Sequence, residues 1–229
     1  RLPNGYIFTY KDFLLSVENK EAAIKALNRL VEKGKINKIS KGKFYKPETT
    51  IFGPLLPNQY QLVKDLLEEE NKITGYLTGY SIYNSLGFTT QVSNTIQIGK
   101  NSLKPNLKRE RYLINFIKQN NTINKENIPY LQLLDCLKTI KKIPDTTINK
   151  SIERFINIFS EYKLKDIKQI LRLAQKYPPS TRALLGALLD ELQLEKYSIT
   201  LLSTLNPITK YNFSGIKDQL TQSKKWNLI

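Results

Sequence analysis

Apolar residues between positions 22 and 36 recur at helical spacing, with polar residues between them. The apolar positions fall at i, i+1, i+4, i+7 and i+8 on one face: Ala23, Ile24, Leu27, Leu30 and Val31. This period is that of an amphipathic helix. Asn19 can cap its first free N–H groups, and Gly34 can end it in a left-handed conformation. The pattern therefore predicts one helix between these two residues.

The flanking residues predict a short helix before this one and a hairpin after it. Thr9 and Asp12 have the Thr-x-x-Asp spacing of a helix N-terminus, which indicates a short helix near residues 10–16. After the longer helix, Gly42 suits a tight turn between two paired strands. Their apolar positions are Ile36, Ile39, Phe44 and Tyr45. Residues 1–47 therefore have the order helix, turn, helix and basic hairpin.

This order is typical of a winged helix-turn-helix domain, whose second helix enters the major groove while its hairpin lies along the phosphates. Lysine and arginine can bond guanine edges there, and asparagine can bond adenine. The groove candidates on the helix are Lys20, Lys25, Asn28 and Arg29. The wing candidates are Lys38, Lys41 and Lys43. The alternative is a winged helix that docks a protein. No first helix is visible before Leu2, so we expect it, and the native start, to lie upstream of residue 1.

Residues 48–229 are expected to form a second, larger domain. Prolines and a glycine punctuate residues 47–57 and indicate a linker there. A short helix is expected from about Gly79 to Leu86, and residues 95–99 alternate as a half-buried strand does. Apolar spacing indicates further helices within residues 60–67, 128–138, 152–159 and 177–192. The fold class is thus α+β: an N-terminal winged helix-turn-helix, then a mixed, mainly helical domain with a small sheet.

Two features of this second domain have competing interpretations. Tyr76, Tyr80 and Tyr83 fall at helical spacing, which favours packing against a neighbouring element over a platform for stacked bases. A second basic cluster could extend a DNA footprint or could be a charged edge strand, and the edge strand is slightly favoured. Its members are Lys104, Lys108, Arg109 and Arg111.

Composition argues for binding rather than catalysis. The 229 residues include no histidine and one cysteine, Cys136, so His-dependent triads, Cys/His zinc sites and an internal disulfide are all excluded. No phosphate-binding loop, nucleophile elbow or paired-aspartate motif is found, and no metal or cofactor is expected. An enzyme that uses carboxylates such as Asp12 or Asp190 has little support. No apolar stretch or signal peptide indicates a membrane, so we expect a cytoplasmic protein.

The net charge of +16 indicates a polyanionic partner. Residues 1–47 contain 11 basic and 4 acidic residues, a net charge of +7, whereas residues 48–102 contain 3 and 5. The positive charge is therefore most concentrated in the N-terminal module. The alternative is that lysine-rich usage reflects a biased genome and only solubilises the surface.

Three stretches resemble the AbiEi-type antitoxins of type IV abortive-infection toxin–antitoxin systems and a related group of uncharacterised bacterial proteins. They are AAIKALNRLVEKGKINKISKGKFYKP, the central TGYSIYNSLGFTTQV and the C-terminal TRALLGALLDEL, which is similar to an Arg-x-x-x-Gly-x-x-Leu helix of that family. Only the central stretch is distinctive. It differs from its counterparts in containing tyrosines where they are richer in alanine.

The resemblance implies a bacterial protein that represses its own operon by binding double-stranded DNA, with inverted repeats as the expected target. The second domain would counteract a cognate nucleotidyltransferase toxin encoded beside it. The resemblance assigns the groove helix to Lys20, Lys25, Asn28 and Arg29 and the wing to Lys41 and Lys43, and it transfers no catalytic residue. A general transcriptional regulator without a toxin partner, or a winged-helix scaffold, remains the alternative.

Overall fold

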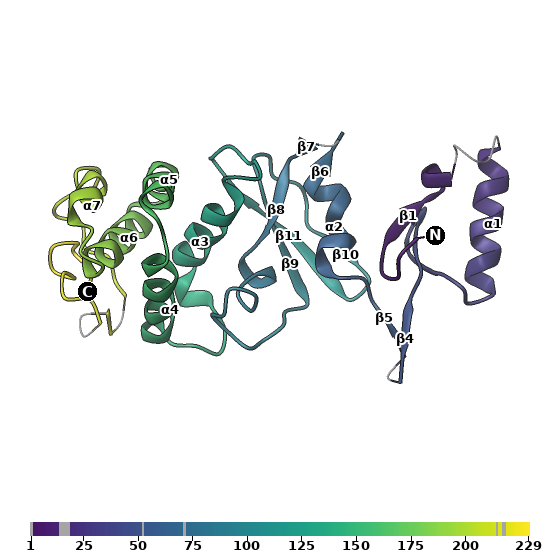
Figure 1. The fold of residues 1–229 in the computed structure, drawn as a ribbon, viewed down its shortest axis with the longest axis horizontal. Helices are drawn as coiled ribbons and strands as arrows, with labels where there is room; N and C mark the ends of the chain where they lie inside the picture. Colours follow the sequence, from purple (N-terminus) through teal and green to yellow (C-terminus); the bar gives the residue numbers. More distant parts are fainter. Residues whose placement is uncertain (1, 14–18, 52, 71, 214, 217–218) are drawn as a thin grey trace.

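The structure is a computed structural model, and it describes residues 2–13, 19–51, 53–70, 72–213, 215–216 and 219–229. The elements follow one another along the long axis of the molecule (Figure 1). Helix α1 lies at one end, next to a small sheet, and the helices α4–α7 lie at the other. A second sheet occupies the middle, between α2 and α3. The mixed α+β fold with a helical C-terminal region is as predicted.

The N-terminal module consists of one helix packed against a three-stranded sheet. Strand β1 (Ile7–Thr9) leads into the 3-10 helix η1 (Tyr10–Phe13), and α1 (Lys20–Glu32) is followed by the hairpin β2 (Asn37–Ser40) and β3 (Lys43–Tyr45). The sheet is antiparallel, in the order β1-β3-β2. The helix and the hairpin are confirmed. Of the short helix expected over residues 10–16, the first four residues form a 3-10 turn, and the remainder lies outside the described residues.

The predicted boundaries of α1 arise from its capping residues. The Asn19 side chain accepts hydrogen bonds from the backbone N–H groups of Glu21 and Ala22 at 2.9 and 3.3 Å. Gly34, just beyond the helix, has a φ of 65°, and Gly42 at the hairpin turn has a φ of 75°. Glycine adopts this left-handed region without the steric cost that a side chain brings. These local signals therefore fix the ends of α1 and the position of the hairpin turn, whereas β1 was not among the predicted elements.

The linker predicted over residues 47–57 contains a two-stranded hairpin, β4 (Glu48–Thr50) and β5 (Gly53–Leu55). Helix α2 (Gln59–Leu67) follows, capped by Asn58. Its apolar residues form a shared core with both sheets: Ile39 and Tyr45 of the N-terminal sheet pack on one side, and Ile96 and Ile114 of the central sheet on the other. The N-terminal sheet is therefore enclosed between α1 and α2.

The central sheet has four strands in the order β10-β11-β9-β8. They are β8 (Gly75–Thr78), β9 (Thr95–Lys100), β10 (Leu107–Arg109) and β11 (Tyr112–Lys118). β9 and β11 are parallel, in a register that pairs Ile98 with Phe116, and the two outer strands are antiparallel to their neighbours. Two further short strands, β6 (Glu68–Glu69) and β7 (Lys72–Ile73), form a separate pair. The strand over residues 95–99 is confirmed, and β10 is an edge strand, as the favoured interpretation required.

The helix expected from Gly79 to Leu86 is wrong in type. Only Gly79–Ser81 is helical, as the 3-10 turn η2, and the residues up to Gly87 form turns. Gly79 has a φ of 54°, and Gln97 of β9 accepts a hydrogen bond from the Tyr80 N–H at 2.9 Å. A carboxamide from the sheet thus satisfies a donor of this turn. Tyr76 and Tyr83 are buried, which agrees with packing rather than stacking, although Tyr76 lies on β8.

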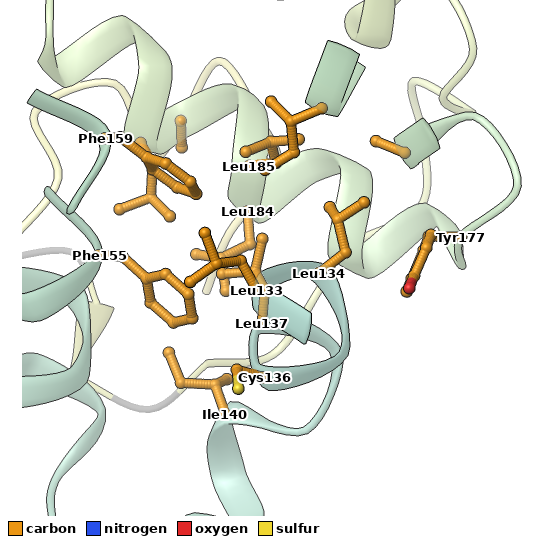
Figure 2. Packing of buried hydrophobic residues seen from close by; sticks show 14 of the residues in the cluster. Leu133, Leu134, Cys136, Leu137, Ile140, Phe155, Phe159, Tyr177, Leu184 and Leu185 are labelled. Carbon is orange, nitrogen blue, oxygen red and sulfur yellow. The ribbon is translucent and has the colours of Figure 1, made fainter. Parts of the chain in front are cut away.

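The C-terminal half is built from five helices and a 3-10 turn around one large core. They are α3 (Ile128–Lys138), η3 (Ile140–Lys142), α4 (Ile148–Ser160), α5 (Leu164–Ala174), α6 (Pro179–Glu191) and α7 (Glu195–Leu202). Figure 2 shows side chains of α3, α4 and α6 meeting there, with Cys136 among them. Helix α6 is buried along most of its length. The Trp226 ring covers Gly186 so closely that an added Cβ would lie 2.1 Å from its Cη2.

A buried carboxylate joins α3 to the central sheet and to the α5–α6 connection. Asp135 accepts hydrogen bonds from the hydroxyls of Tyr76, Thr78 and Tyr177 at 2.6–2.7 Å. Gln119 donates to both tyrosine oxygens. Burial raises the pKa of Asp135, and the three donated hydrogen bonds oppose that shift without cancelling it. None of the sequence patterns indicated this network, because its members are far apart along the chain.

Candidate nucleic-acid interface

Helix α1 presents a polar face away from the sheet it packs on. Ala23 and Leu27 are buried against the module, whereas the four predicted groove residues are exposed: Lys20, Lys25, Asn28 and Arg29. Because α1 lies at one end of the molecule, its outer face is turned away from the other labelled elements (Figure 1). The Lys20 ammonium lies 5.3 Å from the centroid of the Tyr10 ring, so the side chain is partly positioned by η1. The structure brings these four residues onto one accessible helix.

The cations of this helix have no carboxylate partner among the residues that the structure describes. Within the described part of the chain, no Asp or Glu oxygen lies within 4.0 Å of the side-chain nitrogens of Lys20, Lys25 or Arg29. Glu21 and Glu32 share the helix, but neither forms such a pair. Unpaired cations on a rigid helix can neutralise phosphates without first breaking an internal ion pair. This is the electrostatic condition that a groove-binding helix must satisfy.

The three wing residues differ from one another. Lys38 and Lys41 are exposed, and Lys41 stands beside the glycine at the hairpin turn. Lys43 instead forms an ion pair with Asp65 of α2. Its ammonium is turned towards the second domain, and binding a phosphate would require that pair to open. The wing surface that the structure leaves free is therefore Lys38 and Lys41.

Asp65 also neutralises Arg109 of the second basic cluster. The Arg109 guanidinium donates to both Asp65 oxygens at 2.6 and 2.8 Å, and to the Leu62 carbonyl at 2.6 Å. Burial tends to raise the pKa of the Asp65 carboxyl, but the hydrogen bonds from Arg109 and Lys43 outweigh it, so the pKa is lowered. One carboxylate thus connects the N-terminal hairpin, α2 and the edge strand β10. No sequence signal could have found it, because it depends on contacts between distant segments.

The remaining members of the second basic cluster differ in whether they have a carboxylate partner. Lys104 lies 3.4 Å from Glu69, which Lys100 approaches at 2.9 Å. Arg111 is exposed and rests over the Tyr112 ring at 5.2 Å, and Lys108 is exposed. Two of the four predicted residues, Lys104 and Arg109, thus have carboxylate partners. The cluster is an edge strand with local ion pairs rather than a continuous free surface.

The two carboxylates considered for catalysis have structural contacts. Asp12 accepts hydrogen bonds from the backbone N–H and the hydroxyl of Thr9 at 2.6 and 3.1 Å. Asp190 is buried and accepts from Ser198, Lys225 and Trp226. Among the described residues, no three His, Cys, Asp or Glu side chains lie close enough together to hold a metal ion. Nor is any helix in this part of the chain both long and apolar enough to cross a bilayer.

Comparison with known proteins gives a family and a fold. The model of a family of unknown function, DUF6088, matches residues 1–167. No curated protein matches the chain. The crystal structure of the RV2827C protein from Mycobacterium tuberculosis is similar, with a TM-score of 0.59 and 14% sequence identity, over 91% of this chain and 80% of that one. At this identity the likeness concerns the fold alone.

Proposed function

Because the chain belongs to the DUF6088 family, whose function is unknown, we propose its function from its own surface: it is a transcriptional regulator that binds double-stranded DNA through α1 and the β2–β3 hairpin. Lys20, Lys25, Asn28 and Arg29 contact base edges and flanking phosphates, and Lys38 and Lys41 contact the backbone beside them. It works by binding, in the cytoplasm, without a metal or cofactor.

The observation that carries the proposal is the contrast between paired and unpaired cations. Lys43, Lys100, Lys104 and Arg109 all have carboxylates within 4.0 Å, whereas the cations of α1 have none among the described residues. The cations of α1 are exposed on a helix at the end of the molecule, so their charge is available to an external anion. The helix is also capped and anchored by buried Ala23 and Leu27, so its outer face is presented rigidly.

The resemblance to AbiEi-type antitoxins extends the proposal to the C-terminal half. On this basis the protein represses its own promoter at inverted repeats and counteracts a nucleotidyltransferase toxin encoded beside it. Two of the three stretches that carry the resemblance contribute to the central turn region and to the buried helix α6. The α6 stretch is mostly buried, so it supports a shared fold, whereas the central stretch also has exposed residues, among them Asn84, Gln91 and Val92. The antitoxic surface must be sought on exposed residues.

A second candidate function has one observation in its favour. The N-terminal module has an apolar cavity of about 370 Å³ between α1 and β1, lined by Leu2, Phe8, Phe13, Ala23, Ala26, Leu27, Leu30, Ile36 and Lys46. An apolar cavity of this kind could accept a hydrophobic side chain or helix from another protein. In that case the winged module is a protein-docking scaffold, and its basic helix is a solvated face.

Titration of the promoter duplex against purified protein at increasing salt separates these functions. DNA binding predicts that log K falls linearly with log salt, by about 0.9 for each neutralised phosphate. Arg29→Gln should lower the preference for the promoter over random DNA, and Lys210→Gln, an exposed lysine outside the module, is the charge-matched control. Equal binding by both variants, or retention of a partner protein without DNA, would favour the scaffold.

The toxin half of the proposal has its own test. The neighbouring reading frames are expressed singly and together with this chain, and growth is followed. A nucleotidyltransferase that arrests growth alone and not with this protein supports the antitoxin function. If no neighbouring gene product arrests growth, the antitoxin function is not supported and the protein is a general transcriptional regulator.

A further inference from the structure

The helix with the greatest excess of positive charge lies in the C-terminal half. Residues 163–176, which span α5, contain five basic residues and one acidic residue, a net charge of +4. The equally long stretch 20–33, which spans α1, contains four basic and two acidic residues, a net charge of +2. The charge of the N-terminal module is therefore spread over several elements, whereas that of α5 is concentrated on one helix.

Four cations of this stretch make up what we call the α5 basic face: Lys165, Lys168, Arg172 and Lys176. All four are exposed, and they follow one another at intervals of three, four and four residues. The buried side of the helix is apolar: Ile167, Ile170, Leu171, Leu173 and Ala174. With a rise of about 1.5 Å per residue, Lys165 and Arg172 are separated by about 10 Å along one side of the helix. The face is a straight row of charges on a firmly packed helix.

The polar partners of this face are neutral. Arg172 donates to Gln169 at 3.3 Å and to Asn127 at 3.4 Å, and the Lys176 ammonium donates to the Asn120 carbonyl at 3.2 Å. The one acidic residue in the stretch, Asp166, accepts from the Tyr130 hydroxyl and from the backbone N–H of Lys163. No carboxylate among the described residues lies within 4.0 Å of the four cations. The face therefore carries uncompensated charge.

We propose that the α5 basic face binds the phosphate backbone of nucleic acid, without reading its sequence. A phosphate surface needs a row of cations whose charge is not used internally, and this face supplies one. The Asn120 carbonyl and the buried Asn127 side chain, both between β11 and α3, hold Lys176 and Arg172 by neutral hydrogen bonds, so these two cations are positioned without being neutralised.

The chemistry of the face favours nucleic acid over a protein partner. Protein interfaces are depleted in lysine, and their affinity comes from aromatic and apolar anchors in a desolvated centre. The outward residues of α5 are lysine, arginine and glutamine, and the one large apolar side chain exposed on this helix is Leu164, at its first turn. Lysine keeps its ammonium hydrated beside a phosphate, and it needs no such centre.

The α5 basic face is separate from the surface proposed for promoter recognition. The N-terminal sheet, α2 and the central sheet lie between α1 and α5 (Figure 1). The inference therefore goes beyond the proposed function and does not depend on it. Nucleic acid bound on α5 is a second contact of the protein, made either by another segment of the nucleic acid that α1 binds or by a separate nucleic acid.

The test uses a triple variant of the full chain, Lys165→Gln, Lys168→Gln and Arg172→Gln. Its control carries the same charge change at exposed lysines on other elements: Lys142→Gln, Lys150→Gln and Lys224→Gln. Binding of a fluorescent duplex of random sequence is measured between about 50 and about 200 mM salt. The α5 triple should reduce the slope of log K against log salt by up to about 2.7, from three phosphates at about 0.9 each. The control should keep the wild-type slope. Because all the substituted residues are exposed, both triples should melt at the wild-type temperature.

Several outcomes would overturn the proposal. Identical slopes for the two triples would overturn it, because α5 would then contribute only to the overall charge. A wild-type protein that binds no random duplex at about 50 mM salt would overturn it as well. Loss of an acidic partner protein from the α5 triple, with DNA binding unchanged, would assign the face to a protein. The Arg29→Gln variant separates this test from the test of promoter recognition. If Arg29→Gln leaves promoter recognition unchanged, the proposed function fails, but the α5 triple can still reduce the salt slope for random duplex.

Discussion

Lys43, at the start of the second wing strand, forms an ion pair with Asp65 of α2. The pair links the hairpin of the N-terminal module to the helix that covers the opposite face of its sheet. A side chain expected to contact DNA is thereby used to hold the module in place.

This pairing predicts that the wing lysines contribute unequally to DNA binding. Lys41→Gln should weaken binding to all sequences and reduce the salt slope by about 0.9, because a free ammonium is lost. Lys43→Gln should leave the slope almost unchanged, since its charge is already neutralised by a carboxylate. Salt titrations of the two variants against one duplex compare them directly. A larger effect from Lys43 would mean that the ion pair opens when DNA binds.

Removing the shared carboxylate should weaken the attachment of the module and add basic charge. Asp65→Asn leaves Lys43 and Arg109 without their partner, and because the site is partly exposed we expect a loss of about 1 kcal/mol in the free energy of unfolding. The pKa of Asp65 is lowered in the folded protein. Its contribution is therefore present above the unfolded pKa of about 3.9 and is lost as the pH falls through the lower folded value.

Urea unfolding of the wild type and Asp65→Asn, near neutral pH and near pH 3, tests both parts of this prediction, because the difference in stability should shrink in acid. Glu153→Gln, at an exposed position on α4, is the charge-matched control. A difference that persists unchanged in acid would point to a loss of packing instead.

Asp135 should have the opposite pH dependence. Its pKa is raised by burial, so the folded protein binds this proton more tightly than the unfolded chain does. Its contribution to stability is therefore greatest below the unfolded pKa of about 3.9 and declines as the pH rises through the raised folded value. Asp135→Asn should remove that decline, which unfolding measured across the acidic range would show. Asp135→Ala should cost about 3 kcal/mol, because three buried hydroxyls lose their acceptor.

Gly186 is predicted to be intolerant of the smallest side chain. An added Cβ would overlap the Trp226 ring, so Gly186→Ala should destabilise the protein by about 1–3 kcal/mol. In a Trp226→Ala background the same change should cost much less, because the overlapping ring is gone. A double-mutant cycle by thermal or urea unfolding measures this coupling. Equal costs in the two backgrounds would show that the ring is not the cause.

Elements specified by their own residues could be predicted from the sequence. The stripe and caps of α1, the glycine turn of the hairpin, the alternation of β9 and the apolar spacing of α3, α4 and α6 are all local, and each element is found where expected. Lys25, Asn28 and Arg29 of α1 could also be placed away from its apolar stripe, because the helical period alone decides it, whereas Lys20 lies beside the stripe in the first turn.

Features that depend on distant segments could not be predicted in this way. The spacing of residues 79–86 predicts a helix, but Gln97 of β9 accepts a hydrogen bond from the backbone of this segment, which forms turns instead. The linker proved to contain a hairpin, because β4 and β5 pair with each other. The pairing of Lys43 and Arg109 with Asp65 removed two cations from the candidate surface. The local pattern therefore placed charged residues on particular elements, and tertiary contacts decided which of these charges have no carboxylate partner and can bind a phosphate.

The acceptor geometry at Asp135 also constrains how α3 can sit on the sheet. Its two oxygens meet hydroxyls from β8 and from Tyr177, at the α5–α6 connection. If α3 slid along its axis by one turn, about 5.4 Å, the carboxylate would enter an apolar core without donors, while the surrounding leucines could still find contacts. Apolar side chains tolerate such slippage, and a buried carboxyl group that needs hydrogen-bond partners does not. Asp135 therefore fixes the position of α3 along its axis. It makes one packing of the helix more stable than shifted packings whose free energies would be nearly equal if the hydrophobic effect acted alone.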